Sequence, residues 1–495
     1  MDPTIYSSVE DAFDVIIIGA GISGINTAYY LQSQGPQNAS YAILEGRGDI
    51  GGTWDLFRYP GIRSDSDIYT FGFSWNPWKG DNPLASGPAI KSYLHESIST
   101  QGIDKNIRFH HQVTSADWKS TENLWRLQAT VGGEKTKTFK ARFIVLGTGY
   151  YDYEQPLASQ IPGIETFSGP VVHPQFWPKD LDYRNKNVVI VGSGATAVTL
   201  LPNIATDAQS TTILQRSPTY IIGLPKRKGL LSRLMASALP KGISSRILRL
   251  QYMLMGYLFY YYCVLFPRSA RRVLLGRAAK ELPPSIPVDP NFRPRYNPWQ
   301  QRLCVCPDAD FFAALRSGKA DIVTDIIDNV TNEHIFLKSG KTLKPDIIIT
   351  ATGLRIRFGG AISISVDGVH IDPNLKFGFK GCMLQDVPNL AYVFGYANAS
   401  WTLGAEATGT YLVRLWRDMK LQGVTSVTPY IKSAEGMKSR PIMNLTSTYV
   451  KHAAKVFPKA GDGLWAPRRL YMLDLWQAMV GKPFEGLKVA YKSKS

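Results

Sequence analysis

The sequence is poor in cysteine, with four in 495 residues, at positions 263, 304, 306 and 382. Four scattered cysteines are too few for a disulfide framework or a zinc site in a chain of this size. Cys304 and Cys306 form C-x-C, which differs from the C-x-x-C of a dithiol redox centre. We therefore expect packing thiols and no metal site.

Acidic residues are missing from positions 221–280, although the same segment has twelve basic ones. These twelve carry most of the formal net charge of +17. Such a balance raises the question of nucleic-acid binding, but the charges flank an apolar run and do not alternate with polar, base-contacting residues. We expect no nucleic-acid partner. The basic residues are Lys226, Arg227, Lys228, Arg233, Lys241, Arg246, Arg249, Arg268, Arg271, Arg272, Arg277 and Lys280.

No apolar run is long enough for a confident membrane span. The longest, Gln251–Phe266, has sixteen residues where about twenty are needed. The acidic N-terminus runs into glycines and does not resemble a signal peptide, so we expect an intracellular protein, cytoplasmic or peripherally membrane-associated. Gln251–Phe266 fits either a helical insertion over a substrate pocket or a patch that touches an anionic membrane through residues 226–277.

The sequence does contain a strand, a glycine-rich turn and a helix over Asp14–Gly35. Gly19, Gly21 and Gly24 give G-x-G-x-x-G, in which the glycines allow a tight turn, close approach of a pyrophosphate, and close packing of helix on strand. Glu45 ends the next strand, where a carboxylate accepts hydrogen bonds from both ribose hydroxyls. This pattern predicts a dinucleotide site.

A second such unit begins at Lys186, with G-x-G-x-x-A through Gly192, Gly194 and Ala197. Its second strand ends in Arg216-Ser217 in place of an acid, which suits a 2'-phosphate and favours NADP over NAD. Arg216 could also be a solvated loop charge. Two different dinucleotide sites indicate a flavin that is reduced by a nicotinamide cofactor.

Related tripeptides follow two further strands, Gly147–Gly149 and Ala351–Gly353, one downstream of each unit. We therefore expect an α/β protein with two Rossmann-like dinucleotide-binding domains, one for FAD and one for NADP, and a helical insertion in the NADP domain. The expected parts are an FAD domain over 1–165 that returns in 356–495 with the C-terminal region, an NADP domain over 166–220 and 301–355, and a basic, apolar helical insertion over 221–300.

Two longer motifs narrow the class of flavin-dependent protein. "GGTWDLFRYPGIRSDSD" at Gly51–Asp67 and F-x-G-x-x-x-H-x-x-x-W-P at Phe167–Pro178, together with both glycine turns, resemble the Baeyer–Villiger monooxygenases, a family of class B flavoprotein monooxygenases. "QRLCVCPDADFF", starting at Gln301, makes the chain most similar to the mycobacterial ethionamide-activating type. The resemblance covers about 13–220 and 296–402.

The resemblance implies an FAD- and NADPH-dependent enzyme. It would insert one oxygen atom of O2 beside the carbonyl of a hydrophobic ketone, through a flavin C4a-peroxide, and release an ester or lactone. Arg302 matches the family's active-site arginine and Asp65 the acid that orients it, while Asp67 stays an alternative acid. Heteroatom oxygenation of sulfides or amines, and a non-catalytic membrane-associated flavoprotein, are the competing interpretations.

The same resemblance implies the cofactor-binding positions. One departure is Gln301, where many members have a lysine. The implied positions, with those of the two turns, are Gly19, Gly21, Ser23, Gly24, Glu45, Gly52, Thr53, Trp54, Asp65, Val113, Gly192, Gly194, Thr196, Arg216, Ser217, Asn398, Trp401 and Thr402.

His173 and Trp177 lie in the connector just before the second glycine turn. Prolines stiffen this connector, and His173 is placed to hydrogen-bond loop backbone. We expect the pair to form a hinge between the two nucleotide domains, with no direct acid–base role.

Overall fold

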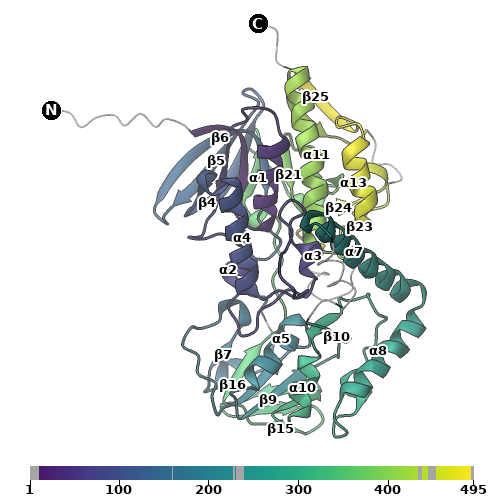
Figure 1. Ribbon diagram of the computed structural model, residues 1–495. Helices are drawn as coiled ribbons and strands as arrows, with labels where there is room; N and C mark the ends of the chain where they lie inside the picture. The colour runs from purple at the N-terminus through teal and green to yellow at the C-terminus, as the bar shows by residue number, and fades with distance from the viewer. Residues whose placement is uncertain are drawn as a thin grey trace, which may run out of the picture.

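The computed structural model describes residues 11–158, 160–226, 229, 239–432, 437–443 and 453–491. Two sheets, one above the other in Figure 1, organise this part of the chain. The expected Rossmann-like α/β fold is confirmed. Part of the basic segment, including Arg227, Lys228 and Arg233, lies outside the described residues.

The larger sheet has eleven strands. They are β1 (Asp11–Ile18), β2 (Tyr41–Leu44), β3 (Ile107–Arg108), β4 (His111–Lys119), β5 (Leu124–Val131), β6 (Lys135–Leu146), β17 (Ser363–Val366), β18 (Val369–His370), β19 (Gly378–Phe379), β20 (Met383–Leu384) and β21 (Leu390–Tyr392). The main path runs β18-β17-β4-β5-β6-β1-β2-β3, and β21 pairs with β6. Strands from both ends of the chain therefore share one sheet.

Strand β1 shows why this sheet forms where it does. Ile16 and Ile17 are fully buried on opposite faces, because neighbouring side chains of a strand alternate in direction. Ile17 packs in a core that includes residues of α1 (Ile22–Gln34) and α11 (Trp401–Gln422), and Ile16 packs in the core that includes Trp118 and Trp125. A continuous apolar run is what a parallel strand covered on both faces requires.

The smaller sheet is parallel throughout, in the order β12-β9-β8-β16-β7. Its strands are β7 (Val171–Val172), β8 (Asn187–Val191), β9 (Ser210–Gln215), β12 (Ala320–Thr324) and β16 (Ile347–Thr350). Helices α5 (Ala195–Ile204) and α10 (Asp310–Arg316) pack in its core, and β10 (Ile221–Leu224) pairs with β11 (Cys304–Pro307) nearby. The connector that precedes the second glycine turn thus enters this sheet as its edge strand β7.

The remaining elements are short or lie near the two main sheets. They are α2 (Thr53–Leu56), α3 (Ile68–Phe71), α4 (Gly87–Gln101), α9 (Val288–Asn291), α13 (Tyr471–Val480), β13 (Ile327–Val330), β14 (Ile335–Leu337), β15 (Thr342–Leu343), β22 (Val424–Pro429), β23 (Arg440–Pro441), β24 (Lys459–Ala460) and β25 (Leu487–Tyr491).

The insertion forms two long helices, α7 (Lys241–Leu265) and α8 (Pro267–Glu281). Helix α7 packs on α3 beside the larger sheet, and α8 packs on β10 beside the smaller one. We call the part of the protein built on the larger sheet the larger-sheet half, and the part built on the smaller sheet the smaller-sheet half. The insertion contacts both halves (Figure 1), although the strands that precede and follow it, β10 and β11, both lie in the smaller-sheet half. None of the helices in the described ranges combines the length and apolar character that a membrane crossing needs.

Candidate functional site

The first glycine turn has the geometry that its motif predicts. Gly19 has φ +100°, and a Cβ there would lie 2.9 Å from the Gly147 carbonyl oxygen. A Cβ on Gly24 would lie 1.9 Å from the Gly19 oxygen, which leaves no room for a side chain. At Gly21 the nearest atom is 3.8 Å away, at Gly52. The turn is closed where helix and strand pack and open where a phosphate would approach.

The N-terminus of α1 also fits a pyrophosphate. Its cap residue is Gly21, and no side chain caps the helix. The first N–H groups and the positive end of the helix dipole are thus left for an anion.

Glu45 is buried beside this turn. Its Oε2 accepts a hydrogen bond from the Ala20 N–H at 2.7 Å, and its Oε1 accepts one from the Arg47 N–H at 2.9 Å. Burial raises the pKa of Glu45, and these two hydrogen bonds offset part of that rise. Each carboxylate oxygen keeps accepting capacity for a ribose hydroxyl.

A cavity of about 330 Å³ opens next to Glu45, with Gly46 and Gln112 in its wall. Val113, the residue after Gln112, is buried in β4 beside a register shift in the β4–β5 pairing. The cavity therefore lies beside the acid that the motif assigns to a ribose.

The second glycine turn repeats the first. Gly192 has φ +140°, and a Cβ there would lie 2.2 Å from the Ala351 carbonyl oxygen, while Gly194 has no atom within 4 Å of its Cβ position. The related tripeptides at 147–149 and 351–353 thus supply the backbone against which each first glycine packs. Arg216 follows β9 as an exposed side chain and Ser217 is half-buried next to it.

The loop after the first unit lies against the first glycine turn. Gly52 has φ +54° and approaches Gly21, and the Thr53 hydroxyl hydrogen-bonds the Tyr153 hydroxyl at 3.1 Å. Trp54 packs edge-to-face on Phe71, with ring centroids 5.7 Å apart. These contacts hold the loop close to the first glycine turn.

Trp401, the first residue of α11, contacts the same glycine turn. Its indole N–H donates to the Ser23 hydroxyl at 2.8 Å, and its ring stacks on Tyr150 at 4.9 Å. Thr402 is fully buried and donates to the carbonyls of Thr70 and Phe71, so it fastens α11 to α3. The Asn398 amide donates to the Arg469 carbonyl at 3.1 Å. Of these three residues, the structure brings Trp401 to the turn.

Arg302 and Asp65 lie together, as the motif predicts. Arg302 Nη1 is 3.8 Å from Asp65 Oδ2, and Nη2 donates to the Tyr396 carbonyl at 3.4 Å. Both side chains stay about one-third exposed, which leaves them accessible to a small molecule. The alternative acid, Asp67, is used elsewhere: it caps α3 by accepting from the Thr70 N–H at 2.8 Å and the Thr70 hydroxyl at 2.6 Å.

The loop that carries Asp65 is held by the smaller-sheet half. Arg63 pairs with Asp310 at 2.7 Å, Gly61 packs on Asn203, and Tyr59 packs against the core around α5. Burial raises the pKa of Tyr59 to about 12, so its hydroxyl stays protonated. Thr196, expected at the NADP site, lies near the start of α5, beside this loop.

His173 bridges backbone, as expected for the connector. Its Nδ1 accepts from the Gln175 N–H at 3.3 Å, so Nε2 carries the proton and donates to the Gly353 carbonyl at 3.2 Å. Burial lowers the pKa of His173, and the Gly353 contact offsets part of that change. Trp177 is partly buried against the core around α5. Neither side chain is among the contacts of Arg302 and Asp65.

Two clusters of charged side chains, around Glu406 and around Asp55, were not predicted from the sequence. Arg249 of α7 donates to the carbonyls of Tyr69, Thr70 and Gly72 and pairs with Glu406 at 2.9 Å. Asp55, directly after Trp54, contacts three cations, Arg47, Arg58 and Lys91. Burial acts to raise the pKa of Asp55, but the hydrogen bonds from Lys91 and Arg47 outweigh it and leave the pKa lowered.

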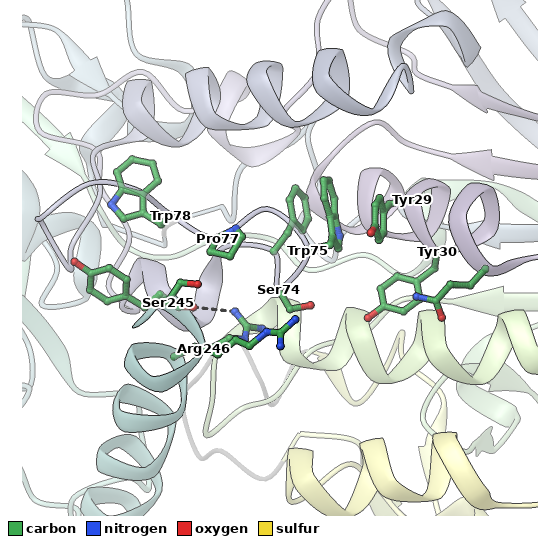
Figure 2. A pocket seen from close by; sticks show the side chains of 12 residues that line it. Tyr29, Tyr30, Ser74, Trp75, Pro77, Trp78, Ser245 and Arg246 are labelled. Atoms are coloured by element: carbon green, nitrogen blue, oxygen red, sulfur yellow. Dashed lines mark hydrogen bonds between the residues drawn. The ribbon is translucent and has the colours of Figure 1, made fainter. Parts of the chain in front are cut away.

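A second cavity, of about 340 Å³, lies away from the glycine turns and Arg302. Figure 2 shows Tyr29 and Trp75 on one side of it and Arg246 of α7 on another. The two rings stack at 4.0 Å. Because its walls come from α1, the 69–78 segment and α7, this cavity belongs to the junction of the insertion with the larger-sheet half.

The thiols are inert packing groups, as expected. All four are free and buried, and burial raises the pKa of Cys304 and Cys306 to about 12. Within the described ranges no group of three or more His, Cys, Asp or Glu side chains is placed to hold a metal ion.

Comparison with known proteins shows which family the chain belongs to. The FAD-containing monooxygenase EthA of Mycobacterium tuberculosis (strain CDC 1551 / Oshkosh) is 43% identical over 480 residues, which cover 96% of this chain and 97% of EthA. The chain belongs to the family of FAD-containing monooxygenases. The resemblance to the mycobacterial type is thereby confirmed, as are a flavin monooxygenase activity and FAD as its cofactor.

Other relatives agree. A probable FAD-binding monooxygenase, AlmA of Acinetobacter baylyi, is 42% identical over 94% of this chain and 93% of its own length. A family model described as pyridine nucleotide-disulphide oxidoreductase matches residues 16–232.

Solved structures share the fold at low identity. OTEMO in complex with FAD and NADP is 20% identical, with a TM-score of 0.73 over 97% of this chain and all of that one. A steroid monooxygenase bound to NADP has a TM-score of 0.76 at 19% identity, over 97% of this chain and all of that one. The chain therefore shares its fold with proteins that were solved with FAD and NADP, or with NADP, bound.

Proposed function

We propose that this monooxygenase oxidises a hydrophobic ketone to an ester or lactone with NADPH and O2, as a Baeyer–Villiger enzyme. The observation that carries the proposal is the Arg302–Asp65 pair, which lies where the larger-sheet half meets the smaller-sheet half. A polycyclic ketone monooxygenase of Thermothelomyces thermophila shares the fold, with a TM-score of 0.76 at 17% identity, 97% coverage of this chain and 90% of that one.

The residues around the first glycine turn would hold FAD. Gly21 and the N-terminus of α1 would take the pyrophosphate, Glu45 the ribose, and the 52–54 loop with Trp401 would lie towards the ring system. Bound FAD, reduced by NADPH, would supply the activated oxygen. NADPH would lie on the Gly192–Gly194 turn, with Arg216 and Ser217 at its 2'-phosphate.

Arg302 would stabilise the negative charge that develops on oxygen as the carbonyl is attacked. A guanidinium suits this task because it stays charged at any working pH and can hold two partners at once. Asp65 would orient the guanidinium through Nη1, and the Tyr396 carbonyl would hold Nη2 in place. His173 and Trp177 would serve as the hinge when the two halves change relative position.

We also propose the division of the chain expected from the motifs: an FAD domain over 1–165 and 356–495, an NADP domain over 166–220 and 301–355, and an insertion over 221–300. The pairing of β17 with β4 and of β7 with β16 supports it.

The test is product analysis. The FAD-loaded protein is incubated with NADPH, O2 and a panel of cyclic, linear and aryl ketones, with sulfides and amines in parallel. Esters or lactones support the proposal. Oxidised sulfides or amines without any ester would favour the heteroatom oxygenase, and the absence of NADPH-driven oxygen uptake would favour a non-catalytic flavoprotein.

Arg302→Ala separates the two half-reactions. NADPH should still bleach the flavin, whereas ester formation should fall by roughly 10²-fold or more, because a fixed charge beside the reacting oxygen is lost. Arg302→Lys keeps the charge but loses the bidentate geometry. Its rate of ester formation should lie between that of the wild type and that of Arg302→Ala. Ester formation at the wild-type rate in Arg302→Ala would remove Arg302 from this role.

A further inference from the structure

Helix α7 exposes a continuous apolar stripe. The most exposed members are Leu258 at 71% and Leu265 at 67%. The spacing of three and four residues puts the whole set on one side of the helix. The stripe consists of Ile243, Ile247, Leu250, Leu254, Leu258, Tyr261 and Leu265.

Helix α13, more than two hundred residues further along the chain, exposes a second stripe. Trp476 is 61% exposed, and its companions on the same face are Met472, Leu473, Met479 and Val480. The two helices touch: the Tyr257 hydroxyl of α7 accepts a hydrogen bond from the Tyr471 N–H at the start of α13, and both rings share a small core with Met253. Helices α7 and α13 therefore lie next to one another (Figure 1), and each carries an exposed apolar stripe.

The inner face of α7 is firmly attached, so the outer stripe is no sign of a loosely placed helix. Arg249 is bonded to three carbonyls and to Glu406, and Phe259 packs in the cluster that contains Leu303. Twelve apolar side chains are thus exposed along two fixed, neighbouring helices, and exposed apolar side chains gathered in this way mark an interaction site.

The charge along α7 and α8 is almost entirely positive: Glu281 ends α8, and α13 has one acid, Asp474, which accepts a hydrogen bond from the Tyr396 hydroxyl. Residues 241–280 contain no Asp or Glu, and α8 exposes Arg268, Arg272, Arg277 and Lys280 after the end of the α7 stripe. Arg246 is exposed near the other end of that stripe. A patch of leucines with tryptophan and tyrosine, bordered by arginine, matches a bilayer surface with negative headgroups.

We propose that the exposed faces of α7 and α13 form one docking surface for an anionic lipid bilayer, on which the enzyme lies without crossing it. The apolar stripes would enter the acyl boundary, and the arginines would pair with lipid phosphates and carboxylates. This inference concerns a surface and does not depend on which substrate is oxidised.

The direct test is co-sedimentation of the FAD-loaded enzyme with vesicles. One set contains phosphatidylcholine alone, and the other contains phosphatidylcholine with about one-third phosphatidylserine. We expect binding to the anionic vesicles to be stronger by roughly tenfold or more at low salt and to weaken as salt is added. Absence of binding to both sets would overturn the proposal.

Two double variants test the two helices separately. Leu254→Gln/Leu258→Gln on α7 and Leu473→Gln/Trp476→Gln on α13 should each lower the vesicle partition coefficient by roughly tenfold or more. Val369→Gln/Leu375→Gln is the matched control, because Val369 and Leu375 are 67% and 65% exposed but lie outside both helices. Unchanged flavin content shows that each variant is folded.

A second copy of the chain is the competing occupant, and sedimentation velocity distinguishes it. If the α7 variant converts a dimer to a monomer and the wild type ignores both vesicle sets, the surface is a self-association interface and the lipid proposal is wrong. If only the α7 variant loses vesicle binding, α13 is no part of the surface.

Discussion

Arg249 Nη2 lies 2.9 Å from Glu406 Oε2, and Glu406 also accepts a hydrogen bond from the Tyr471 hydroxyl at 2.7 Å. Three helices, α7, α11 and α13, thus share one buried carboxylate. The pairing joins the insertion to the larger-sheet half.

Arg249→Met should therefore destabilise the protein. The substitution leaves Glu406 buried without its cation and frees three backbone carbonyls, so we expect a loss of about 3 kcal/mol in the free energy of unfolding. Urea unfolding followed by flavin fluorescence measures it. Lys79→Ala, which breaks the exposed pair with Glu96, should cost less than about 1 kcal/mol. Equal losses in both variants would contradict the role given to the buried pair.

Gly24→Ala should abolish flavin retention. The added Cβ would lie 1.9 Å from the Gly19 oxygen, so helix α1 must move away from the turn. The absorbance ratio of flavin to protein after purification is the measurement. Gly276→Ala on α8 is the control, since nothing lies within 4 Å of its Cβ position, and it should keep its flavin and gain up to about 1 kcal/mol of helix stability.

Arg216→Ala should weaken the preference for NADPH. Removing a charge-assisted contact to the 2'-phosphate should raise the KM for NADPH by roughly tenfold or more and leave that for NADH nearly unchanged. Flavin reduction in the absence of oxygen gives both values. Arg126→Ala, in β5 of the other sheet, should alter neither. A parallel rise for both cofactors would mean that Arg216 has no part in 2'-phosphate recognition.

His173 should make stability depend on pH. Burial lowers its pKa in the folded state, so the unfolded chain takes up the proton first as the pH falls through about 6.5. The free energy of unfolding should therefore fall from pH 7.5 towards pH 5.5, and the fall should be smaller in His173→Gln. Unfolding at both pH values checks the difference. The same slope in both proteins would show that other groups cause it.

Much of the nucleotide-binding geometry could be predicted because it depends on local backbone. Gly19 and Gly192 occupy conformations that favour glycine, and each faces a carbonyl that a Cβ would strike. The spacing of such residues shows in the sequence. The Arg302–Asp65 pair was predicted through its motifs. The structure also distinguishes the two candidate acids, because Asp65 pairs with Arg302 whereas Asp67 caps α3.

What could not be predicted depends on contacts between distant segments. Arg249 reads in the sequence as one more basic residue of a charged segment, and Glu406, 157 positions away, carries no pattern that marks it as its partner. Likewise, Trp476 and Leu473 have the spacing of a core-facing helix, yet they are exposed, because α13 turns its other face to α11. Burial of such residues is set by tertiary packing.

The Tyr59–Asp65 loop has a mechanical consequence. It belongs to the larger-sheet half, yet the smaller-sheet half holds it through the Arg63–Asp310 pair, the packing of Gly61 on Asn203, and the packing of Tyr59 on the core around α5. Any rotation of the smaller sheet must break these contacts or pull the loop along, and Asp65 moves with the loop. Arg302 lies just before β11 of the same smaller-sheet half, so Asp65 and Arg302 would move together as long as these contacts hold, and the pair would stay intact during such a rotation.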